Sequence, residues 1–138
     1  MRILALDPGD QHLGLALSDE TGALARPLTT LKHESRAKDA EHIVALAVEH
    51  HAEMILIGLA LDSSGNVGPQ ARKAKRLAEA IRALTPLPVV THDESFTTAA
   101  AQHALRAAGK KRRDRRKQIH AAAAAALLQS YLDAHPRK

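Results

Sequence analysis

The apolar residues of this chain form short runs, and their order along the sequence limits the fold more than any other feature. Three runs of strand length come first, at Arg2–Asp7, Leu13–Ser18 and Leu24–Leu31, separated by glycine-containing turns. Connections this short join antiparallel strands, because parallel strands need a long crossover. We therefore expect a three-stranded antiparallel meander, with Pro27 favouring an edge position for its last strand.

Longer segments with helical spacing alternate with strands in the rest of the chain. Ser35 is a candidate N-cap for an amphipathic helix that extends to His51. Glu53–Leu59 is the most apolar strand, for which we expect a central position. A second helix runs from Pro69 to Leu84, and Leu87–His92 is the next strand.

Two further helices complete the predicted order. Thr97 can cap a helix that Gly109 terminates, and Ile119–Ala134 forms a final alanine-rich helix after the basic run. The sequence thus predicts an α/β fold with a five-stranded mixed sheet, composed of the antiparallel meander plus two parallel strands and flanked by helices. We expect residues 1–138 to form one domain.

The charge of the chain is concentrated in one segment. Lys and Arg number 20 against 15 Asp and Glu, and the segment from 110 to 117 reads KKRRDRRK. Such a run is typical either of a surface that binds the nucleic-acid backbone or of a solvated basic loop. Stacking of bases is nearly excluded, because Phe96 and Tyr131 are the only large aromatic residues. The predicted nucleic-acid contacts are Lys110, Lys111, Arg112, Arg113, Arg115, Arg116 and Lys117.

Other function classes are excluded by what the sequence lacks. Without cysteine there is no disulfide, thiolate zinc site or cysteine nucleophile. No stretch approaches the roughly 20 apolar residues of a membrane span, and the first residues, MRILALDPGD, do not resemble a signal peptide. We expect a cytoplasmic protein.

Two acidic residues stand where the first and last strands end. Asp7 ends the first strand and Glu94 follows the last, and we expect these strands to be neighbours in the sheet. Carboxylates that meet at the carboxyl edge of a sheet repel each other unless a cation lies between them. Oxygen ligands favour Mg²⁺ or Mn²⁺, which can activate water for attack on a phosphate. The alternative is structural, since Asp7 also suits a turn and Glu94 a helix start.

Four blocks of the sequence resemble the YqgF family, also called RuvX, in the same order and spacing. They read ALDPGDQHLGLALSDETGALARPL, GLALDSSGNVGPQARKAKRLAEAI, PVVTHDESFTTAAAQHAL and IHAAAAAALLQSYLD. Members of that family are described as Holliday junction resolvases and as nucleases of pre-16S rRNA. The resemblance covers almost the whole chain and implies an RNase H-like fold with metal-dependent hydrolysis of phosphodiester bonds.

The resemblance also implies roles for individual residues. It identifies Asp7 and Glu94 as metal-binding acids, with Asp93 as a weaker candidate. The family has a third acid at the start of the last helix, and here that position holds His120. An imidazole can bind Mn²⁺ or Mg²⁺, with Mn²⁺ preferred, or act as a general acid or base. Alternatively, His120 is a surface residue and the metal site is weaker.

Several polar residues remain secondary candidates. Gly65 and Gly68 allow a close approach to phosphate but also suit an ordinary strand–helix connection. Thr97 and Thr98 suit a helix cap first and substrate contacts second. The basic residues between 72 and 76 suit either a solvated helix face or part of the substrate surface.

The expected function is a metal-dependent nuclease acting on structured nucleic acid. Its substrates would be the 5′ end of pre-16S rRNA, linking it to ribosome biogenesis, and/or Holliday junctions, linking it to DNA recombination. The alternative is a catalytically impaired nucleic-acid-binding factor of ribosome maturation with the same fold. The sequence does not choose between RNA and DNA, between endo- and exonuclease, or between monomer and homodimer.

Overall fold

The computed structural model describes residues 1–61, 65–93 and 112–135, with the backbone alone for 112–118. Its centre is a mixed sheet of five strands in the order β3-β2-β1-β4-β5. The strands are β1 (Ile3–Pro8), β2 (His12–Ser18), β3 (Ala25–Lys32), β4 (Met54–Leu59) and β5 (Val89–Asp93).

Strand pairing confirms the expected sheet. β1 pairs antiparallel with β2, which pairs antiparallel with β3, whereas the β1–β4 and β4–β5 pairs are parallel. Pro27 lies in β3 at the edge of the sheet, next to a shift of register between Leu15 and Ala16 of β2. Proline is tolerated there because an edge strand does not need every backbone N–H for pairing.

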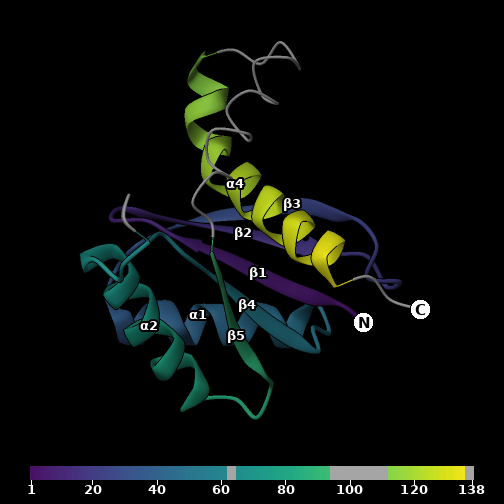
Figure 1. Cartoon of the computed structure of the whole chain (residues 1–138), viewed down its shortest axis with the longest axis horizontal. Coiled ribbons are helices and arrows are strands. Elements are labelled where there is room, and N and C mark those ends of the chain that lie inside the picture. Colours follow the sequence, from purple (N-terminus) through teal and green to yellow (C-terminus); the bar gives the residue numbers. More distant parts are fainter. Residues whose placement is uncertain (62–64, 94–111, 136–138) are drawn as a thin grey trace.

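Helices cover both faces of the sheet (Figure 1). α1 (Arg36–Glu49) and α2 (Pro69–Arg82) cover one face, and α4 (Arg112–Ala134) covers the other. The Ser35 side chain accepts a hydrogen bond from the backbone N–H of Lys38 and caps α1, as the sequence predicts. Among the helices that the structure describes, none is both long and apolar enough to cross a membrane.

The alternation of side chains along the strands separates two cores. Leu4 and Leu6 of β1 pack with α1 and α2, whereas Ile3 and Ala5 pack under α4. The alanines of α4 let the helix lie close to the sheet, and Leu127 and Leu128 fill the space beneath it.

One prediction about the arrangement is wrong. The strands that precede Glu94 and end at Asp7 are not neighbours, because β4 lies between β5 and β1. This order follows from parallel pairing, since the crossover through α1 delivers β4 directly beside β1. β4 is therefore an interior strand, as expected.

The predicted start of the last helix is also wrong. α4 begins at Arg112, not at Ile119, so most of the basic run is helical. Arginine and lysine are good helix formers, and neither glycine nor proline occurs between Gly109 and Pro136 to stop the helix. The helix predicted from Thr97 to Ala108 lies outside the described residues.

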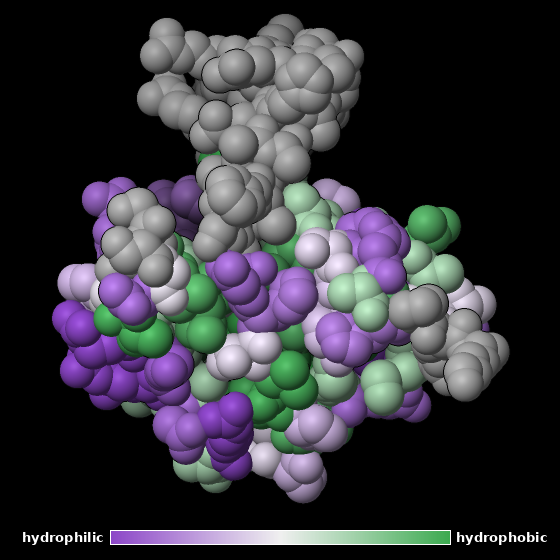
Figure 2. Space-filling model, viewed as in Figure 1, coloured by the Kyte–Doolittle hydropathy of each residue, from purple (hydrophilic) through white to green (hydrophobic). Residues whose placement is uncertain are grey.

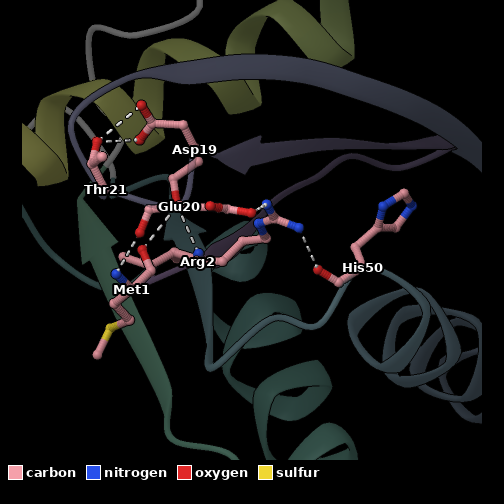
Figure 3. Close-up of polar contacts among 8 residues, drawn as sticks. Met1, Arg2, Asp19, Glu20, Thr21 and His50 are labelled. Atoms are coloured by element: carbon pink, nitrogen blue, oxygen red, sulfur yellow. Dashed lines mark hydrogen bonds and ion pairs between the residues drawn. The ribbon is translucent and has the colours of Figure 1, made fainter.

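A dense set of polar contacts fixes the amino end of β1 (Figure 3). The N-terminal ammonium of Met1 donates to the carbonyl of Glu20 at 2.9 Å. The Arg2 guanidinium donates to the carbonyl of His50 at 3.2 Å and to the Glu20 carboxylate at 3.3 Å. These contacts tie the first strand to the β2–β3 turn and to the end of α1.

Candidate active site

Asp7 lies near the carboxyl end of β1, on the face that α4 covers. Strand alternation puts its side chain on the same face as Ile3 and Ala5. The residue is only 9% exposed. Within the part of the chain that the structure describes, no hydrogen bond or ion pair reaches its carboxylate. Because a buried charge without a partner costs free energy, this carboxylate is suited to bind a cation.

Gly14 lies directly opposite Asp7 in the β1–β2 pair and lets α4 approach the sheet. A Cβ atom at Gly14 would lie 1.8 Å from the carbonyl oxygen of His120 and 2.8 Å from the backbone nitrogen of Ala121. The helix backbone therefore occupies the space that any side chain at this position would need. This close packing places His120 beside the end of β1.

Two imidazole rings accompany the Asp7 carboxylate. His12 of β2 stacks on His120 of α4, with 5.2 Å between ring centroids and 22° between ring planes. Burial lowers the pKa of His120, as does the positive charge that His12 can carry, while the negative charge of Asp7 opposes this shift. The neutral imidazole, the form that binds metals, is thus favoured at neutral pH.

β5 reaches the same edge of the sheet as Asp7, two strands away. On the α4 face, Nε2 of His92 lies 3.5 Å from Oγ of Ser130, and the His92 ring meets Tyr131 edge-on. Alternation along β5 assigns Asp93 to the opposite face from His92 and Asp7. Glu94 is joined directly to Asp93 but lies outside the described residues.

The residues around Asp7 suit a divalent cation. The donors are a buried carboxylate without a described partner and an imidazole that burial keeps neutral. A mixed oxygen and nitrogen donor set suits Mn²⁺ better than Mg²⁺, which prefers oxygen. Among described residues, no three His, Asp or Glu side chains converge as a metal-binding group. Glu94, the remaining predicted ligand, is outside that set.

The structure describes only some of the other predicted residues. Gly65 has a positive φ of 79°, and a Cβ atom added to it would meet no other atom within 4 Å. Gly68 is the N-cap of α2. Thr97 and Thr98 lie outside the described residues. So do Lys110 and Lys111, whereas residues 112–117 form the first turns of α4.

Sequence reasoning missed His12 and Gly14. A glycine inside a strand pattern often marks a close approach of another backbone, and the sequence LGLALS carries that signal at Gly14. His12 stands two residues before it and therefore shares its face. The stacking of His12 on His120 has no signal in the sequence, because the two residues are far apart along the chain.

Two solved structures share this arrangement of strands and helices. T. thermophilus RuvC in complex with a Holliday junction substrate aligns with a TM-score of 0.61 over 99% of this chain and 96% of that one, at 17% identity. Fowlpox virus resolvase in complex with Holliday junction DNA aligns with a TM-score of 0.62 over 99% and 100%, at 12% identity. The fold is therefore the RNase H-like fold of RuvC-type resolvases.

Sequence comparison identifies the family within this fold. The family model RuvX, described as Holliday junction resolvase, matches residues 1–134. A protein of Thermoanaerobacter pseudethanolicus named "Putative pre-16S rRNA nuclease" is 39% identical over the full length of both chains. One of the same name from Syntrophus aciditrophicus is 40% identical over 97% of this chain and 89% of its own. The chain belongs to the RuvX family and is a hydrolytic nuclease.

Proposed function

We propose that this nuclease cleaves structured nucleic acid with the help of Mn²⁺ or Mg²⁺ held by Asp7, Glu94 and His120. The observation that carries the proposal is the Asp7 carboxylate, buried under α4 without a partner among the described residues. A structural aspartate at this position would be expected to accept hydrogen bonds, as the buried Asp39 does from the Glu34 backbone N–H at 3.1 Å.

Each residue of the proposed site has a distinct task. Asp7 supplies a negative charge from the middle of the sheet, where the backbone cannot easily move. His120 supplies a neutral nitrogen, and His12 stacks on its ring and restricts its orientation. Glu94 supplies the second carboxylate, following directly on β5. A divalent ion bound there would activate water and stabilise the charge that develops on the phosphate.

The basic segment from 110 to 117 is proposed to hold the substrate. Residues 112–117 begin the helix that carries His120 about two turns later. Phosphate contacts position a nucleic acid without reading its sequence. Binding should therefore tolerate changes of sequence and weaken as salt concentration rises.

The names of the relatives indicate the substrate. We infer that the chain processes the 5′ end of pre-16S rRNA and/or cleaves branched DNA such as Holliday junctions, in the cytoplasm, as a single domain of residues 1–138. The alternative is a catalytically impaired ribosome-maturation factor that binds nucleic acid. The observation that favours this alternative is His120. A site with three acids binds a divalent cation more tightly than a site in which histidine replaces one of them.

A cleavage panel tests the proposal. The substrates are a four-way DNA junction, single-stranded DNA and a structured rRNA precursor, each with Mg²⁺ and with Mn²⁺. We expect Asp7→Asn to reduce the cleavage rate at least about 100-fold, because the metal contributes several kcal/mol and about 1.4 kcal/mol corresponds to a tenfold change. Asp133→Asn, which removes an exposed carboxylate of α4, is the matched control.

The same panel separates the two functions. Full activity of Asp7→Asn would contradict the site, and no cleavage by the parent chain with either metal would favour the impaired binding factor. His120→Ala should lower the rate in Mn²⁺, whereas His120→Asp should raise the rate in Mg²⁺ by restoring an oxygen ligand. A rate unaffected by His120→Ala would remove His120 from the site.

A further inference from the structure

A concave site lies on the face of the sheet opposite to Asp7, between α1 and α2. It is a pocket of about 240 Å³ whose floor includes Leu13 and Leu77. The loop Pro8–Asp10 forms one wall, and a Cβ atom on Gly9 of that loop would lie 3.9 Å from Cε1 of His120. The loop therefore separates the pocket from the proposed metal site, with one on each side.

The two acidic residues of the pocket already have partners. Asp10 accepts hydrogen bonds from Gln70 at 2.9 Å and from Lys73 at 3.3 Å, and both contacts, that of Gln70 first, lower its pKa. Asp39 is buried and bonds to the His33 ring. The charge of Asp10 is thus balanced by Lys73, and the carboxylate of Asp39 is satisfied within the protein.

Two guanidinium groups of the pocket have no such partner. Arg36 enters it from the start of α1, and Arg76 enters it from the middle of α2. Neither guanidinium group forms an ion pair or a hydrogen bond with another residue that the structure describes. They contrast with Arg82, whose guanidinium binds Glu79 and the Val89 carbonyl. A pair of unpaired arginines at a concave surface leaves a positive charge for an external anion.

The chemistry of the pocket fits a phosphate group. The fork of N–H donors on arginine matches the oxygens of phosphate, and two forks can hold one group from two sides. The volume lies below the roughly 300 Å³ at which pockets for drug-sized ligands begin, which suits one phosphate with part of its sugar. Figure 2 shows strongly hydrophilic side chains over α2, the helix that carries Arg76, so the surface beside this helix is polar.

We propose that the pocket binds a phosphate group through Arg36 and Arg76. The group is supplied by the nucleic-acid strand, across the Pro8–Asp10 loop from the scissile phosphate, or by a free nucleotide. In the first case the inference rests on the proposed function and deepens it, because the pocket would then fix the direction in which the substrate crosses the carboxyl edge of the sheet.

Binding without cleavage tests this proposal. The full chain is titrated in EDTA against a fluorescein-labelled four-way DNA junction and a labelled RNA stem-loop, over roughly 50 to 200 mM salt. We expect the double variant Arg36→Gln/Arg76→Gln to bind at least about tenfold more weakly. The slope of log K against log salt should become smaller by about 1, which is the effect of one lost phosphate contact.

The control is a double variant with the same loss of charge outside the pocket. Arg26 lies on β3 and Lys38 lies on α1 two residues after Arg36, and neither borders the pocket. Arg26→Gln/Lys38→Gln should change affinity by no more than about twofold, as expected for rim charges. If the pocket variant weakens binding no more than this control, the strand does not use the pocket.

A second arm distinguishes the source of the phosphate. Calorimetry measures binding of 5′-AMP and of inorganic phosphate to the parent chain and to the pocket variant. Binding by the parent that the variant loses assigns the pocket to a free nucleotide. Unchanged affinity of the variant for nucleic acid, with no binding of 5′-AMP or phosphate by the parent, overturns the proposal.

Two further variants separate a loss of phosphate binding from a loss of charge or of folding. Arg36→Lys/Arg76→Lys keeps the charge and should recover part of the affinity. If the double glutamine variant does not fold, Arg76→Gln alone replaces it, because Arg76 is exposed. Since the titration needs no metal, loss of cleavage in Asp7→Asn bears on the active site and leaves the pocket to be judged by binding.

Discussion

The two ends of β1 are built for different purposes. At its amino end, polar groups are paired: the Ile3 N–H donates to Ser18 Oγ at 2.7 Å, and Met1 and Arg2 bond to Glu20. At its carboxyl end, the buried Asp7 carboxylate has no partner among the described residues. One strand thus carries paired polar groups that stabilise the fold at Ile3 and, four residues later, a carboxylate that is free to bind a ligand at Asp7.

At the carboxyl end of β1, stability has been given up for function. A buried hydrogen bond contributes about 1 kcal/mol, and a buried charge without a partner opposes folding. Natural proteins accept such an unfavourable group mainly at functional sites. Substitutions at each end of β1, and at Gly14 of β2 where α4 packs against the sheet, test this difference.

The largest effect is expected at the carboxyl end, for Gly14→Ala. The new Cβ would overlap the His120 carbonyl, so α4 must move away from the sheet, at a cost of about 3 kcal/mol or more. Chemical denaturation measures the loss of stability. Gly65→Ala is the control, because Gly65 has a positive φ but open space, and its cost should be about 1 kcal/mol. Equal losses in the two variants would show that α4 does not depend on Gly14.

A smaller effect is expected at the amino end, for Ser18→Ala. Ser18 is 1% exposed, and without its oxygen the buried Ile3 N–H loses its acceptor, which should cost about 1–3 kcal/mol. Thr21→Ala is the control. It removes an exposed hydroxyl that donates to the Asp19 carboxylate in the β2–β3 turn, and it should lower the free energy of unfolding by less than about 0.5 kcal/mol. The same denaturation experiment checks both, and similar losses would mean that the amino end of β1 is no special anchor.

The smallest effect, and one of opposite sign, is expected for Asp7→Asn in the absence of metal. Removing the unpartnered buried charge should stabilise the fold by roughly 0.5–2 kcal/mol. Added Mn²⁺ should raise the Tm of the parent chain and leave that of the variant unchanged, because only the parent binds the ion. Destabilisation like that of Ser18→Ala would make Asp7 a structural residue and end the contrast between the two ends.

Much of the fold follows from the sequence because it depends on local pattern. The short apolar runs predict the strands, Ser35 predicts the start of α1, and Pro27 predicts an edge. The predicted start of α4 was wrong because a run of like charges suggests a loop, although Arg and Lys have high helix propensity. Sheet order was less predictable, since placing β4 beside β1 depends on the crossover.

The candidate site is only partly readable in the sequence. Asp7 stands out as an acid at the end of an apolar run, and the resemblance to the RuvX family singles out His120. His12 carries no such mark, since one histidine among nine has no local pattern. The arginines of the pocket are also unmarked, because Arg36 and Arg76 belong to different helices and look like ordinary solvated residues.

The family, the strands and the acid at the end of β1 are recognisable in the sequence, because each depends on residues close together along the chain. Three features are visible only in the folded chain: Asp7 is buried without a described partner, His12 stacks on His120, and Arg36 and Arg76 share a pocket. They could not be predicted, because burial and charge balance depend on which distant segments pack together. In this protein, α4 can pack closely against β2 because Gly14 has no side chain.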